Sequence, residues 1–305
     1  MSPVNGFFHL VRWQNLVFIA LTQALFYFCI YYPLFHHSDY RKLILLLLAS
    51  VFIAAAGYII NDYFDLNIDQ INKPKKIVID KVIGRRWAIV WHLALSFVGV
   101  VFTSFAVGLH YWYLILANVF CVVLLWLYST SFKRQLLVGN LVISILTAWT
   151  ILVFFFAFSA PHNAFNTTNE LSVKFFRMAM LYGGFAFVIS LIREAVKDME
   201  DIKGDARYGC RTLPIVVGIR TAKLYTAIWM SVLLATLAIL QFYVLQFGWW
   251  HSVVYALLLV VAPLFYSLQK LRKAYRTRDF AELSSLTKWI MLSGILSMLF
   301  FAFYF

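Results

Sequence analysis

Residues 43–69 read LILLLLASVFIAAAGYIINDYFDLNID, and this stretch decides the fold. Its first 18 residues, 43–60, carry no charge, and a helix needs ~20 predominantly apolar residues to span a bilayer. The remaining residues hold three carboxylates, Asp62, Asp65 and Asp69. Acidic side chains at membrane depth are costly and mark a functional site by default. The stretch therefore predicts a membrane-spanning helix that ends in a functional acidic cluster.

The composition extends this prediction to the whole chain of 305 residues. Hydrophobic residues make up 63% and charged residues 13%, against ~45–50% and ~25% in soluble domains. A soluble, disordered or coiled-coil protein is excluded, and a β-barrel would show ~10-residue alternating segments instead of continuous apolar runs. We predict an all-α polytopic membrane protein of about nine transmembrane helices, in the ranges 14–35, 43–64, 87–107, 111–131, 139–159, 174–197, 221–246, 250–269 and 285–305.

The basic residues predict the orientation of these helices. With the N-terminus in the cytoplasm and nine alternating spans, 22 of the 26 Lys and Arg residues fall on the cytoplasmic side, as the positive-inside rule requires. We therefore expect a multi-pass protein of the cell (inner) membrane. The net charge of +13 suits anionic membrane lipids or a phosphorylated substrate. Nucleic acid is not expected as a partner, because no soluble domain is present to bind it.

A second acidic cluster repeats the spacing of the first. Asp198, Asp201 and Asp205 follow the same pattern as Asp62, Asp65 and Asp69, and on a continuous helix such residues lie within about 60° of one another. Glu194 extends the second face by one turn, whereas Glu200 falls ~200° from Asp198 and is expected in solvent. The alternative is that these acids only end helices in headgroup water. Two matched clusters on one side of the membrane favour a function.

Like charges on one helix face repel one another and need a counter-charge. Mg²⁺ binds carboxylates and shares its other positions with substrate phosphates. Basic residues beside the clusters complete a predicted diphosphate site: Lys73, Lys75, Lys76, Lys81, Lys133 and Arg134. We expect Asp→Asn variants at the two clusters to be inactive, because they lose the charge that binds Mg²⁺. We expect them to be at least as stable as the parent without Mg²⁺, because removal of one acid reduces the repulsion between like charges.

These segments also carry a family resemblance. Residues 61–69, NDYFDLNID, resemble the NDxxDxxxD motif of the UbiA-type intramembrane prenyltransferases, and residues 193–205, REAVKDMEDIKGD, resemble their second acidic motif. The turn that holds Tyr128, Lys133 and Asn140 is similar to the one after the fourth helix of that family. Within the family, both acidic segments are most similar to those of digeranylgeranylglyceryl phosphate synthases.

The resemblance implies one UbiA-like membrane domain over residues 1–305, with its helices around a central cavity open to the cytoplasmic side. It implies Mg²⁺-dependent transfer of a polyprenyl, geranylgeranyl-like group from its diphosphate to a lipid acceptor such as a prenylglyceryl phosphate, with release of diphosphate. The catalytic and metal-binding residues it implies are Asp62, Asp65, Asp69, Asp198, Asp201 and Asp205. The substrate-binding residues are Asn61, Lys73, Lys81, Tyr128, Lys133, Arg134, Glu194 and Lys197.

Three alternatives stay open at the level of the sequence. The acceptor of the same chemistry could be an aromatic quinone precursor. A membrane transporter could use the acids as a relay, although transporters place such acids near the bilayer midplane. An alcohol phosphatidyltransferase also pairs acids with a metal, but its DxxDGxxAR signature is absent.

Overall fold

The computed structural model describes residues 3–72, 74, 78–159 and 170–304. Within these ranges the regular elements are all helical, and nine stretches are long and apolar enough to cross a membrane. The all-α prediction is therefore confirmed. The spans are Trp13–Phe35 (α2, Trp13–Phe26; η1, Tyr27–Tyr31; α3, Tyr32–Phe35), Tyr40–Asn72 (α4), Arg85–Val107 (α5), Leu109–Thr130 (η2, Leu109–Tyr111; α6, Trp112–Thr130), Val138–Ser159 (α7), Glu170–Glu200 (α8), Leu213–Leu245 (α10), Trp250–Lys273 (α11, Trp250–Ala256; η5, Leu257–Val261; α12, Ala262–Lys273) and Thr277–Tyr304 (α13, Thr277–Leu296; η6, Ser297–Phe300; α14, Phe301–Tyr304).

Several helices run further than their predicted apolar windows. Helix α4 continues to Asn72, whereas its apolar window was predicted to end at residue 64. Helix α10 starts at Leu213 instead of residue 221, and Gly218 interrupts it with φ 81°, a conformation that glycine adopts without steric cost. Hydropathy locates only the apolar part of a helix, so polar continuations at its ends escape it.

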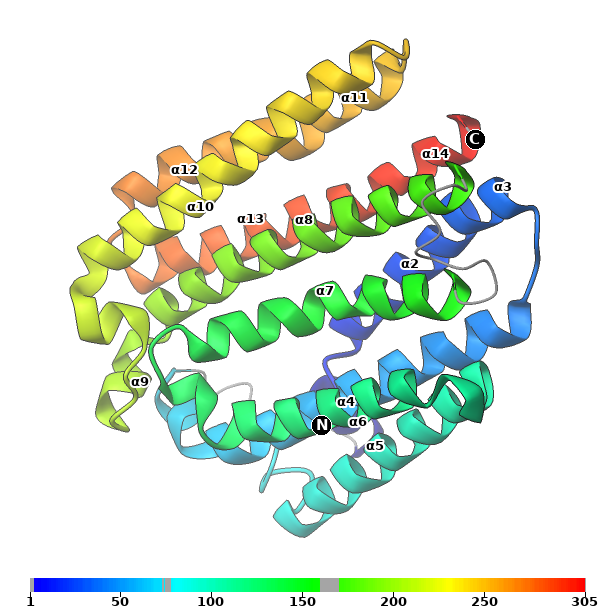
Figure 1. The fold of residues 1–305 in the computed structure, drawn as a ribbon. Coiled ribbons are helices and arrows are strands. Elements are labelled where there is room, and N and C mark those ends of the chain that lie inside the picture. The colour runs from blue at the N-terminus through cyan, green and yellow to red at the C-terminus, as the bar shows by residue number, and fades with distance from the viewer. Residues whose placement is uncertain (1–2, 73, 75–77, 160–169, 305) are drawn as a thin grey trace.

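The long helices run side by side as one bundle (Figure 1). Helices α4, α5 and α6 form one side, α10 and α12 form the other, and α7 and α8 lie between them. The end of the bundle that holds residues 61–72 and 198–207 is called the motif end below. At the opposite end aromatic rings fill the interior, as where Tyr31 and Phe158 approach to 4.6 Å between centroids. This packing closes the bundle far from the acidic clusters.

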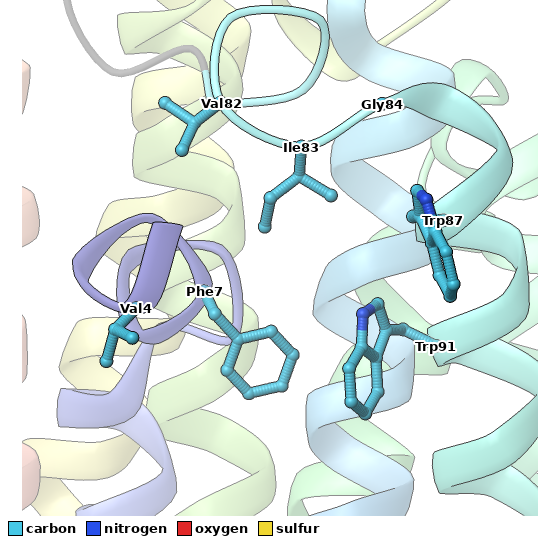
Figure 2. A pocket seen from close by; sticks show the side chains of 7 residues that line it. All are labelled: Val4, Phe7, Val82, Ile83, Gly84, Trp87 and Trp91. Carbon is cyan, nitrogen blue, oxygen red and sulfur yellow. The ribbon is translucent and has the colours of Figure 1, made fainter. Parts of the chain in front are cut away.

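A short N-terminal helix, α1 (Pro3–Leu10), packs beside the start of α5. Figure 2 shows Phe7 and Trp91 side by side, with 5.0 Å between the ring centroids, in the lining of an apolar hollow of about 400 Å³. A Cβ on Gly6 would lie 2.6 Å from a methyl carbon of Val82, so only glycine allows this approach. The packing fixes the place where α1 ends and therefore the position of Arg12, which follows it.

Candidate active site

A cavity of about 660 Å³ lies between helices α2, α4, α6, α7, α8 and α13. It reaches from the motif end into the apolar interior of the bundle. The structure brings both acidic segments to this one cavity, although more than 120 residues separate them in the sequence. The predicted site residues that line it are Asn61, Asp62, Asp65, Asp69, Tyr128, Lys133, Glu194, Lys197, Asp198, Asp201 and Asp205.

The first acidic cluster lies on the continuous helix α4, as its spacing predicts. Lys133 Nζ lies 2.6 Å from Asp65 Oδ1, and Asn61 Nδ2 donates to Asp65 Oδ2 at 2.8 Å. The same ammonium group donates to Asn61 Oδ1 at 3.4 Å. Lys133 and Asp65 are only 10% and 18% exposed. Their pair is mostly shielded from water, so it is stronger than a surface ion pair.

Arg12, which enters the sequence analysis only as one of the 22 cytoplasmic Lys and Arg residues, supplies a second counter-charge to the first acidic cluster. Its Nη2 lies 2.6 Å from Asp62 Oδ1, and its guanidinium lies 5.2 Å from the ring centroid of Tyr58. The nearby carboxylate of Asp62 raises the pKa of Arg12 above its ordinary value, so the guanidinium stays charged. Arg12 adopts a left-handed conformation, φ 51°, between α1 and α2. No motif spacing predicts this contact.

Lys133 is held by the tight turn between α6 and α7. The turn contains the short helix η3 (Phe132–Arg134). A Cβ on Gly139 would lie 2.8 Å from Lys133 Cα, so glycine is required for α7 to begin this close. The carbonyl oxygen of Arg134 accepts a hydrogen bond from the backbone N–H of Arg211 at 2.8 Å. This bond ties the turn to the segment that follows the second acidic cluster.

Two predicted substrate-binding cations, Arg134 and Lys81, lie elsewhere, and a third falls outside the described residues. The side chain of Arg134 is exposed and is not part of the cavity lining. Lys81 is exposed as well, and its ammonium group donates to the carbonyl of Pro74 at 3.2 Å. Lys73 falls outside the described residues, as do Lys75 and Lys76. Of the members of the predicted basic rim that the structure describes, Lys133 alone lines the cavity.

The second acidic cluster does not lie on one continuous helix, which corrects the sequence analysis. Helix α8 ends at Glu200, and Asp201 is the N-cap residue of the short helix α9 (Ile202–Arg207). The ~100° step per residue does not carry across this break. Glu200, expected in solvent, lines the cavity together with Asp201.

Asn72 connects the two acidic segments. Its Nδ2 donates to the carbonyl oxygen of Asp201 at 3.0 Å, and its Oδ1 accepts from the backbone N–H of Gly204 at 2.9 Å. A Cβ on Gly204 would lie 2.5 Å from this amide group. The end of α4 therefore positions the start of α9. The sequence analysis missed Asn72, whose place after the first acidic cluster was the only available signal.

The remaining acids of helix α8 also have polar partners. Asn140 Nδ2 donates to Asp198 Oδ2 at 3.0 Å. Glu194 is buried, and its Oε1 lies 3.1 Å from Arg193 Nη1 and 2.9 Å from Lys197 Nζ. Arg193 lies within the second motif segment but is not among the predicted substrate-binding residues, although it contacts Glu194.

Among the described residues, no three His, Cys, Asp or Glu side chains are close enough to hold a metal ion in this arrangement. Two of the carboxylates are instead paired with cations. The donor set nevertheless fits Mg²⁺, because carboxylate oxygens from both segments line one cavity and Mg²⁺ needs only one or two of them beside substrate phosphates.

Comparison with known proteins identifies the family. The family model described as the UbiA prenyltransferase family matches residues 11–302. The chain belongs to the UbiA prenyltransferase family. It is therefore an enzyme, a membrane-embedded prenyltransferase.

Two relatives and one solved structure illustrate the similarity. The digeranylgeranylglyceryl phosphate synthase of Methanothermobacter thermautotrophicus is 32% identical over 84% of this chain and 83% of its own length. That of Sulfurisphaera tokodaii is 32% identical over 79% of this chain and 80% of its own length. The structure of a UbiA homologue from Archaeoglobus fulgidus bound to GPP and Mg²⁺ is 15% identical, covers 96% of this chain and 99% of its own, and superposes with a TM-score of 0.61. This last likeness shows the fold alone.

Proposed function

We propose that this prenyltransferase moves a geranylgeranyl-like group from its diphosphate to a prenylglyceryl phosphate in a Mg²⁺-dependent reaction. The names of the two relatives support this acceptor, and the ligands of the Archaeoglobus fulgidus homologue support the metal and the prenyl diphosphate. The observation that carries the proposal is the convergence of two acidic segments and Lys133 on one cavity. An aromatic acceptor by the same chemistry is the alternative that the experiment below tests.

The cavity residues divide into two roles in this proposal. The carboxylates of Asp62, Asp65, Asp69, Asp198, Asp201 and Asp205 hold Mg²⁺ beside the donor diphosphate. When bound, the metal neutralises charge that develops on the diphosphate as it leaves. Lys133 and Asn61 already touch Asp65, so they lie where they can donate to diphosphate oxygens. Tyr128 lines the same cavity, and an aromatic face stabilises an adjacent carbocation.

The bond changes of the proposed reaction are simple. The bond between C1 of the prenyl group and the diphosphate oxygen breaks, and the electron pair leaves with the diphosphate. A hydroxyl oxygen of the acceptor forms an ether bond to C1. The hydroxyl proton leaves with the released diphosphate, so that atoms and charge balance.

The proposal includes the placement of the protein. The chain forms a single UbiA-like domain over residues 1–305, in a cell membrane, with its N-terminus and the motif end on the cytoplasmic side. The distribution of Lys and Arg residues supports this orientation. It gives the cavity access to water-soluble Mg²⁺ and to diphosphate release on the cytoplasmic side.

A reconstituted transfer assay tests the function. Purified protein in lipid nanodiscs receives geranylgeranyl diphosphate, Mg²⁺ and either geranylgeranylglyceryl phosphate or 4-hydroxybenzoate. We expect diphosphate release and an ether product, identified by mass spectrometry, with the glyceryl phosphate only, and loss of both on addition of EDTA. Product with the aromatic acceptor alone, or undiminished turnover in EDTA, would contradict the proposal.

A further inference from the structure

Three cations line the cavity on the side away from α4. Arg193 and Lys197 belong to α8, and Lys288 belongs to α13. All three fall within candidate membrane spans. A basic residue inside a span is costly and, where it faces a cavity, marks a substrate or ion site. In the first acidic cluster, Asp62 pairs with Arg12 and Asp65 with Lys133, whereas Arg193 and Lys197 pair with Glu194.

The register of α8 against α13 brings Lys288 to the same level as Arg193. Tyr182 Oη lies 3.0 Å from Ser297 Oγ. Three residues further along α8, the ring of Phe185 lies 2.5 Å from the position that a Cβ on Gly294 would take. The two pairs define antiparallel helices, which lie side by side in Figure 1.

Continuing this register toward the motif end by six residues pairs Lys288 with residue 191. The step is ~9 Å along each helix at 1.5 Å per residue. Ser190 and Arg193 are the cavity-lining residues on either side of that level. Lys288 therefore lies at the level of the part of α8 that carries Arg193 and Glu194, and it lines the same cavity.

Arg193 and Lys197 share one carboxylate, that of Glu194, at this level of the cavity. Arg193 Nε is buried and has no hydrogen-bond partner among the described residues, and a buried donor without a partner is costly. The next carboxylate toward the motif end, Asp198, accepts a hydrogen bond from Asn140. Lys288 adds a third cation to this group.

We infer that Arg193, Lys197 and Lys288 form a binding site for the phosphate of the acceptor lipid, an inference that rests on the proposed function. A guanidinium presents a planar fork of donors that matches a phosphate, and the two ammonium groups add charge. Lys133 and Asp65, where the donor diphosphate binds in the proposed function, line the same cavity from the turn between α6 and α7 and from α4. The acceptor phosphate and the donor diphosphate would therefore be held by cations from different elements of one cavity.

The cavity also provides for the hydrocarbon chain of such an acceptor. Beyond Lys288 along α13, the lining continues through Met291, Ile295 and Met298. These side chains are apolar, and they extend away from the motif end. An acceptor whose phosphate is held at Lys288 therefore lays its isoprenoid chain against α13, and its one free glycerol hydroxyl group lies between the phosphate and the chain.

The test compares two acceptors that differ only in the phosphate, geranylgeranylglyceryl phosphate and geranylgeranylglycerol. Lys288→Met keeps the length of the side chain and removes the charge. We expect it to raise the KM for the phosphorylated acceptor at least about tenfold, the size of a charge-assisted hydrogen bond, with no change in the KM for the donor. The preference for the phosphorylated acceptor should fall by the same factor. Arg193→Lys, which keeps charge but loses the fork, should give a smaller loss of the same kind.

Lys273→Met is the matched control, because Lys273 is an exposed cation at the motif end outside the cavity lining. It should leave both KM values unchanged. Heat stability is measured in parallel with each acceptor, and the phosphorylated one should stabilise the parent more than it stabilises Lys288→Met. Equal effects of Lys288→Met on both acceptors, or a change in donor KM alone, would overturn the inference. If the phosphorylated acceptor stabilised the parent but not Lys288→Met, and no ether product formed, the phosphate site would be upheld and the proposed function refuted.

Discussion

The pair formed by Lys133 and Asp65 gives the sharpest prediction for stability. Asp65→Asn removes one charge of a pair whose atoms lie 2.6 Å apart and whose side chains are 10% and 18% exposed. Exposed pairs contribute ~0–1 kcal/mol, whereas breaking a buried pair costs ~3–5 kcal/mol. This partly shielded pair lies between these limits, so we expect a loss of about 2 kcal/mol. Over a chain of this length, that corresponds to a decrease in Tm of about 3 °C. This reverses the expectation from repulsion alone.

The double variant Asp65→Asn with Lys133→Met separates the ion pair from other effects. It leaves no unpaired charge, so its Tm should return toward that of the parent. Turnover should be lost in both variants, because both lack the carboxylate proposed to hold Mg²⁺. Thermal unfolding in nanodiscs without Mg²⁺ and the transfer assay measure the two effects. The assignment of the pair would be refuted if Asp65→Asn alone were as stable as the parent. It would also be refuted if the decrease in Tm of the double variant equalled the sum of the decreases of Asp65→Asn and Lys133→Met.

Three further outcomes are expected at the same site. Gly204→Ala should lower the free energy of unfolding by ~1–3 kcal/mol and reduce turnover, because the added Cβ would lie 2.5 Å from the side-chain amide of Asn72. Gly184→Ala is the control: a Cβ at this helical glycine would meet no atom within 4 Å, so the variant should match the parent in the same unfolding and transfer assays. In a variant whose other cysteines are replaced by Ser, the alkylation rate of Cys210 should reach half its maximum at a pH above the ordinary thiol pKa of ~8.5, because burial raises the pKa of this thiol. A half-maximal rate at or below that pH would contradict this. Glu200→Gln should raise the Mg²⁺ concentration for half-maximal turnover several-fold, because Glu200 lines the cavity. An unchanged Mg²⁺ titration would show that Glu200 does not contribute to metal binding, as the sequence analysis expects of a residue in solvent.

The first acidic cluster shows how far the sequence can predict a site. Asn61, Asp62, Asp65 and Asp69 lie on one uninterrupted helix, so their relative directions follow from helical geometry alone. The apolar residues before them place this helix in the membrane. Local rules were sufficient here because a single element carries the whole feature.

The second cluster shows where such rules fail. Its spacing matches the first, but the chain leaves the helix at Asp201, where φ is −94° and ψ is 5°. Contacts from elsewhere hold this break, since Asn72 binds the backbone of both Asp201 and Gly204. The partner lies 129 residues away from Asp201 in the sequence. Nothing within residues 198–205 signals it, so the direction of Glu200 could not be predicted.

Arg12 and Lys288 escaped prediction for a related reason. Each is a single cation in a chain with 26 Lys and Arg residues, most of which serve orientation. Arg12 reaches Asp62 only because α1 ends beside α4, and Lys288 lines the same cavity as Arg193 only through the packing of α8 against α13. Both placements depend on packing between helices, which hydropathy and motif spacing do not describe.

The ion pairs also set the conditions under which the acidic cluster can bind a metal. In this structure the counter-charges of Asp62 and Asp65 are Arg12 and Lys133, which come from two separate turns. A metal that takes Asp65 must displace Lys133, and a cost of about 2 kcal/mol would weaken its apparent affinity about 30-fold. A donor diphosphate offsets this cost, because the displaced ammonium group can bind its oxygens. The geometry therefore favours binding of Mg²⁺ together with the diphosphate over binding of Mg²⁺ alone.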